Sequence, residues 1–108
     1  MDHQRIDERS LAFGEAIARH LQQKPELIAL ARANVVRWLG TCSPRLESTL
    51  REWLTALDGP VEGVIDLLTS RDERATRLRQ SNPFAGALPQ DERNEILLRF
   101  QSNDAARA

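Results

Sequence analysis

The sequence lacks tyrosine, has one cysteine (Cys42) and one lysine (Lys24), and contains no long apolar run. With a single cysteine no intramolecular disulfide can form, which fits a reducing cytosol. The polar start of the chain cannot be the apolar core of a signal peptide. No stretch approaches the ~18 consecutive apolar residues that a membrane span needs. We therefore expect a cytoplasmic protein that does not bind a membrane.

The sequence also lacks a strong excess of charge of either sign. Its 15 basic and 16 acidic residues give a formal net charge of -1, so no global field draws the chain to nucleic acid or to acidic lipid. Hydrophobic residues make up 41% and charged residues 29%, which is a globular balance and not a disordered one. A chain of 108 residues suits one domain.

Apolar positions recur at spacings of three and four along almost the whole chain, and alternating strand patterns are scarce. We predict an all-α fold, a compact bundle of about five to six helices with short loops. The predicted helices span residues 6–23, 25–39, 44–57, 60–68, 70–80 and from 89 onward. The wide apolar face of the second predicts that it forms the centre of the core. The run Ser70 to Glu73 predicts a capping box with Ser70 as the N-cap.

The chain divides into a helical bundle core, residues 1–80, and a C-terminal part, residues 81–108. The C-terminal part begins with an uncharged loop, in which Pro83 and Gly86 forbid a regular helix, and continues as an amphipathic helix. It belongs to the same domain or forms a partner-binding extension. Phe84 decides between these alternatives, because burying such a ring is worth roughly 2 kcal/mol or more. The ring either completes its own bundle or anchors the loop and helix in a partner's groove.

Residues suited to catalysis are few and scattered. The two histidines, His3 and His20, show no metal-like spacing, and Cys42 has no histidine near it in the sequence. No glycine-rich phosphate loop is present. The paired carboxylates fall at predicted helix starts, where the helix dipole accounts for them. We predict that the protein is not an enzyme and uses no metal or cofactor.

The most basic stretch carries Arg71, Arg74 and Arg77 in the fifth predicted helix. These side chains either contact phosphate or an acidic partner, or form a solvated face with internal salt bridges. The second and third helices could form a helix-turn-helix, but Glu47 and Glu52 on the third would repel the DNA backbone. A DNA-binding transcriptional regulator that uses an Arg-bearing helix is the alternative function.

The run Arg79 to Leu88, followed by Glu92-Arg93 and the stretch from Ile96 to Phe100, resembles the C-terminal signature of small bacterial antitoxin-like proteins. The N-terminal part is similar too, at residues 9–21 and 25–39, so that the resemblance covers about residues 5–100. It implies a protein that neutralises a toxic enzyme, encoded in the same operon, by occluding it. The residues carried over are Pro83, Phe84, Ala85, Gly86 and Leu88. Many antitoxins also repress their own operon, but no separate DNA-binding element is evident here.

We therefore predict a non-catalytic interaction protein that neutralises a toxin-like enzyme by direct binding. The sequence leaves open whether the chain also self-associates. The predicted partner-binding residues are Arg79, Pro83, Phe84, Ala85, Gly86, Leu88, Arg93, Ile96 and Phe100.

Overall fold

The computed structural model describes residues 3–107, with side chains for residues 5–101, and contains six α-helices and no strand in that part of the chain. The predicted all-α fold is confirmed. The helices are α1 (His3–Gln23), α2 (Leu27–Leu39), α3 (Pro44–Leu57), α4 (Val61–Thr69), α5 (Glu73–Arg79) and α6 (Gln90–Arg107).

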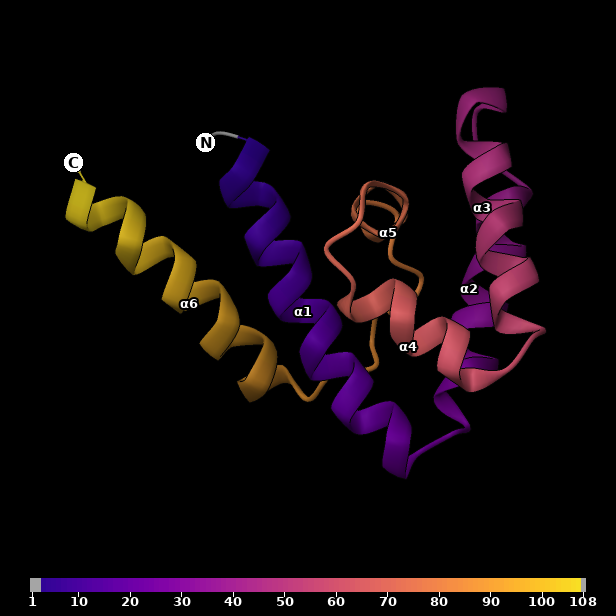
Figure 1. The fold of residues 1–108 in the computed structure, drawn as a ribbon, viewed down its shortest axis with the longest axis horizontal. Coiled ribbons are helices and arrows are strands. Elements are labelled where there is room, and N and C mark those ends of the chain that lie inside the picture. Colours follow the sequence, from indigo (N-terminus) through magenta and orange to yellow (C-terminus); the bar gives the residue numbers. More distant parts are fainter. Residues whose placement is uncertain (1–2, 108) are drawn as a thin grey trace.

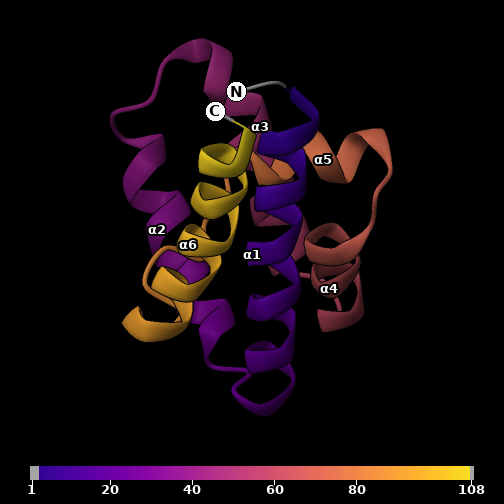
Figure 2. The same cartoon turned by 90° about the vertical axis from the view of Figure 1, so that its left-hand side faces the viewer.

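Helix α1 contacts α4, α5 and α6, α2 pairs mainly with α3, and α4 links α3 to α1 (Figures 1 and 2). The prediction that the helix at residues 25–39 forms the centre of the core is wrong. In α2 only Ala31, Asn34 and Val35 are buried, and Val36 is 51% exposed. Part of the apolar face of α2 is therefore not covered by the neighbouring elements.

The core is centred on Trp53 of α3, whose side chain is completely buried. Its indole Nε1–H donates to the carbonyl oxygen of Leu78 at the end of α5, over 2.9 Å. The ring of Phe84 meets the indole edge to face, with centroids 6.4 Å apart and planes at 74°, a favourable aromatic geometry. One side chain thus joins α3, α5 and the loop that follows α5.

Gly14 marks the place where α1 comes closest to α4. A Cβ atom built at Gly14 would lie 2.0 Å from the carbonyl oxygen of Leu68 and 3.1 Å from Cδ of Arg79. No side chain fits at such a distance from another backbone. The glycine therefore allows the packing of α1 on α4 and α5.

The first turn of α5 is capped by Asp72, and the predicted capping box is wrong. The Asp72 carboxylate accepts the N–H of Ala75 over 2.7 Å. The Ser70 hydroxyl instead accepts the N–H of Asp72 over 3.1 Å. The N-cap lies two residues later than the pattern predicted, because aspartate serves as an N-cap as well as serine does.

The Asp72 cap makes stability depend on pH. The hydrogen bond from the Ala75 N–H, with a smaller contribution from Ser70, lowers the pKa of Asp72 from its ordinary value. A carboxyl whose pKa is lower in the folded chain stabilises the fold fully above its unfolded pKa, and this contribution is lost as pH falls through the lowered value.

We expect Asp72→Asn to weaken the response to acid, because the amide still caps the helix but does not titrate in this range. Urea unfolding at about pH 7 and about pH 3 measures the loss of stability on acidification, below the ordinary carboxyl pKa of about 4. The loss should be larger in the unsubstituted chain than in the variant. An equal loss in both would show that Asp72 makes no such contribution.

The last helix, α6, lies along α1 (Figure 2). Ile96 is buried in this contact, and His20 Nε2 lies 2.6 Å from Glu92 Oε2. Arg5 of α1 donates a hydrogen bond to the carbonyl oxygen of Phe100. Across the described residues, no helix is both long and apolar enough to cross a membrane.

Candidate functional site

The uncharged loop, residues 81–88, packs on the bundle of its own chain. Phe84 is 2% exposed and belongs to the core cluster. Of the two alternatives for this ring, the structure shows the one in which it completes its own bundle. Phe84 therefore does not project as an anchor, and any contact with a partner has to use the surface beside it.

A tight turn shapes the loop immediately after Phe84. The N–H of Ala87 donates to the carbonyl oxygen of Phe84 over 3.0 Å, and Gly86 has φ of +88° at the third position of the turn. A positive φ at that position favours glycine. The turn therefore explains why position 86 is a glycine, without any role in binding a partner.

Asn34 of α2 ties the loop to the bundle. This buried amide donates from Nδ2 to the carbonyl oxygens of Pro83 (2.8 Å) and Ala85 (3.2 Å), and its Oδ1 accepts from Arg37 (2.8 Å). Buried polar groups that are fully paired in this way fix a conformation, because releasing them would leave donors and acceptors without partners. The loop is therefore held in one shape.

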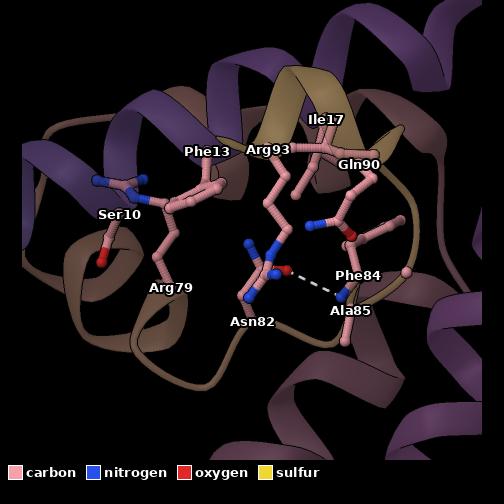
Figure 3. A pocket seen from close by; sticks show the side chains of 11 residues that line it. Ser10, Phe13, Ile17, Arg79, Asn82, Phe84, Ala85, Gln90 and Arg93 are labelled. Carbon is pink, nitrogen blue, oxygen red and sulfur yellow. Dashed lines mark hydrogen bonds between the residues drawn. The ribbon is translucent and has the colours of Figure 1, made fainter. Parts of the chain in front are cut away.

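An open groove lies between α1, this loop and the start of α6, with a volume of about 410 Å³ (Figure 3). Its lining is mainly apolar near α1 and the loop, and polar near α6. The lining residues are Ser10, Phe13, Ile17, Arg79, Asn82, Phe84, Ala85, Gly86, Leu88, Gln90 and Arg93. A preformed hollow with an apolar floor and a few polar groups is typical of binding sites.

The two arginines of the groove have different surroundings. Arg79 is only 4% exposed, and its guanidinium donates to the carbonyl oxygen of Leu67 over 2.8 Å. Burial lowers the pKa of Arg79 from its ordinary value, although an arginine remains charged at neutral pH. Its Nε has no hydrogen-bond partner among the described atoms. The aliphatic part of the Arg79 side chain therefore forms part of the groove wall, while its guanidinium group donates a hydrogen bond inside the fold.

Arg93 is exposed in the first turn of α6. Figure 3 shows its side chain reaching toward Asn82, whereas the guanidinium of Arg79 lies beside Ser10. Among the described residues that line the groove there is no aspartate or glutamate. The groove thus combines an apolar floor with a positive charge at its mouth.

The structure brings together six of the nine predicted partner-binding residues in this lining. The six are Arg79, Phe84, Ala85, Gly86, Leu88 and Arg93. Pro83, within the loop, and Ile96, on α6, are both buried. The half-buried ring of Phe100 lies near the guanidinium groups of Arg5 and Arg99. Pro83, Ile96 and Phe100 therefore lie outside the groove.

Five lining residues were not predicted from the sequence: Ser10, Phe13, Ile17, Asn82 and Gln90. The α1 residues among them lie on the predicted apolar stripe and looked like ordinary core positions. Only the docking of the loop beside α1 shows that part of this stripe faces a hollow. Asn82 had a weak local signal, because asparagine before proline is common in turns.

Arg71, Arg74 and Arg77, the three arginines of the predicted basic stretch, are each matched by a carboxylate. Arg71 pairs with Glu8 at 2.7 Å, and Glu52 accepts from both Arg74 (3.4 Å) and Arg77 (2.9 Å). The hydrogen bond from Arg77 is the main reason that the pKa of Glu52 lies below its ordinary value. Phosphate would have to compete with these carboxylates, so the arrangement favours the solvated face with salt bridges.

The described side chains include no group of three or more histidine, cysteine, aspartate or glutamate residues that could hold a metal ion. Cys42 is half-buried, and its Sγ lies 3.8 Å from the carbonyl oxygen of Leu39. His20 is engaged with Glu92, and the side chain of His3 lies outside the described side chains.

The groove between α1, Arg79, the loop after α5 and the start of α6 is therefore the candidate functional site. Comparison with known proteins gives no match to any protein-family model, curated protein or solved structure.

Proposed function

We propose that this chain is a non-catalytic interaction protein that neutralises a toxin-like enzyme, encoded in the same operon, by binding one of its segments in the groove. The resemblance of Arg79 to Leu88 to antitoxin-like proteins motivates the choice of partner. The buried ring of Phe84 reverses the expected direction of insertion. This chain supplies the groove, and the partner supplies the inserted segment.

The observation that carries the proposal is the open groove with an apolar floor and an exposed arginine at its mouth. A partner side chain that fills such a floor gains roughly 1.5–3 kcal/mol from burial. The floor is already ordered, since Phe84 packs on Trp53 and Asn34 holds the loop. Preorganisation of this kind lowers the entropy cost of binding.

The positive charge at the mouth selects a partner segment of negative charge, because complementary potentials raise association rates and disfavour wrong partners. We place this interaction in the cytoplasm, because a chain with a single cysteine forms no internal disulfide and therefore suits a reducing compartment.

The proposal is tested by co-expressing the chain with the product of the adjacent gene. We expect the two proteins to purify as a complex, and the growth arrest caused by the partner alone to be relieved. Ala85→Trp places a large side chain at an exposed position of the groove, and should weaken capture about tenfold or more. That loss equals about 1.4 kcal/mol, which is within the contribution of one buried apolar side chain.

Ala33→Trp is the matched control, because Ala33 is exposed on α2 and does not line the groove. It should leave capture and growth unchanged. Absence of a complex with the unsubstituted chain would rule out this partner. Equal capture by both tryptophan variants would show that the partner binds elsewhere.

A further inference from the structure

We propose that Arg93 makes the groove selective for a side-chain carboxylate next to an apolar side chain in the bound segment. This inference rests on the proposed function, since it names the chemical groups that the partner must present. The proposed ligand is a peptide segment, and Arg93 is the residue that recognises its negative charge.

Arg93 is placed where it can reach a ligand in the groove. It is exposed in the first turn of α6 and lines the groove, and its side chain extends along the groove toward Asn82 (Figure 3). Gln90, one helical turn earlier, also lines the groove. A ligand on the apolar floor therefore lies within reach of a flexible guanidinium group.

Arg93 has no carboxylate partner among the described side chains. The ion pairs there engage Arg19, Arg32, Arg51, Arg71, Arg74 and Arg77. Arg79 lines the same groove but donates to the carbonyl oxygen of Leu67 inside the fold. Arg93 is therefore the groove arginine whose guanidinium is available to a ligand.

The floor of the groove beside this charge is apolar. Phe13, Ile17 and Phe84 come from α1 and the loop, and the latter two are almost completely buried. An ion pair next to such a low-dielectric surface is stronger than one in open water. Guanidinium and carboxylate also form two parallel hydrogen bonds, which adds directionality.

Asn82 provides a second polar contact for the carboxylate. Its Oδ1 accepts the N–H of Phe84 over 2.9 Å, which leaves the amide N–H groups as donors at the groove. The combined chemistry is an apolar floor, a guanidinium group and an amide donor. An apolar residue followed by an acidic residue fits this combination, whereas a neutral or basic segment would leave Arg93 unpaired.

The test uses the full chain, labelled with nitrogen-15, and small probes. Acetyl-leucyl-glutamate amide carries one side-chain carboxylate and no free chain ends, and acetyl-leucyl-glutamine amide is its neutral counterpart. We expect both to shift amide resonances around Phe13, Phe84 and Arg93. The glutamate compound should bind about tenfold more tightly, as expected for a charge-assisted hydrogen bond.

Arg93→Gln should remove the difference between the two probes. Arg45→Gln is the matched control, because Arg45 is exposed on α3 and does not line the groove. Equal affinities in the unsubstituted chain, a difference that persists in Arg93→Gln, or no groove shifts at millimolar probe would overturn the inference. Binding of inorganic phosphate without binding of the acidic probe would also overturn it.

These outcomes separate the inference from the proposed function. If the partner is captured but the probes are not discriminated, the selectivity assigned to Arg93 is wrong and the interaction function stands. If the probes are discriminated but the adjacent gene product is not captured, the groove chemistry stands and the toxin-like partner is wrong.

Discussion

Replacing Gly14 with alanine should destabilise the fold by about 3 kcal/mol or more, the upper range for overpacking a well-packed interior. The added methyl group would lie 2.0 Å from the carbonyl oxygen of Leu68. The obstacle is backbone and not the end of a flexible side chain, so the whole of α4 would have to move away from α1. The helix preference of alanine over glycine offsets only about 1 kcal/mol.

Gly63→Ala is the matched control. Gly63 lies in the same helix pair, on α4, and a Cβ atom there meets nothing within 4 Å. The same substitution should therefore stabilise the chain by up to about 1 kcal/mol. Urea unfolding followed by circular dichroism measures both variants. A Gly14→Ala variant as stable as Gly63→Ala would contradict the close packing of α1 on α4.

Trp53→Ala should cost about 3–5 kcal/mol, the usual range for truncating a buried aromatic side chain. The indole fills the centre of the core, contacts the Phe84 ring and donates to the carbonyl oxygen of Leu78. A domain of this kind is stable by about 5–15 kcal/mol in total. The variant should therefore lose a large part of the stability of the fold, and the 81–88 loop should lose its packing on the indole.

Two further variants separate the effects at Trp53. Trp53→Phe keeps much of the apolar volume but loses the hydrogen bond to Leu78, and should cost about 1–3 kcal/mol. Trp38→Ala removes the other tryptophan, which is half-buried on α2, and should cost less than Trp53→Ala. Circular dichroism is the suitable readout, since fluorescence changes with each substitution. Equal losses for both tryptophan-to-alanine variants would contradict the central position of Trp53.

The helices could be predicted from the sequence because each carries its own signals. Apolar spacing marked the helix faces, and Pro44 and Asp58-Gly59-Pro60 marked the limits of α3. How the helices pack could not be predicted in the same way, because packing depends on contacts between residues that are far apart in the sequence. The wide apolar face of α2 predicted a central helix, whereas Gly14, a residue without a side chain, allows α1 to pack closely on α4.

Gly14 carried no distinguishing signal in the sequence. A glycine within a helical pattern costs stability, but Gly63 lies within α4 in the same way and a Cβ atom there meets nothing within 4 Å. Phe84 carried no distinguishing signal either, because an aromatic residue in an uncharged loop suits both a core and an interface. The ring is placed by the Trp53 indole from α3 and the Asn34 amide from α2. Both contacts are long-range and leave no local pattern.

The candidate groove could be predicted only in part for the same reason. Its loop side and Arg93 stood out because that segment is unusual in composition. Its α1 side did not, because Phe13 and Ile17 repeat an ordinary helical stripe. A groove is formed by the relative position of elements, and the sequence reveals it only where one of them is locally unusual.

The most direct test of the central claim is an amide resonance map of the labelled chain in complex with the product of the adjacent gene. We expect the largest changes at Phe13, Asn82, Phe84 and Arg93, and no change in the salt-bridged region of Arg71, Arg74 and Arg77. Changes confined to that region, or to the α2–α3 pair, would contradict the assignment of the groove as the binding site.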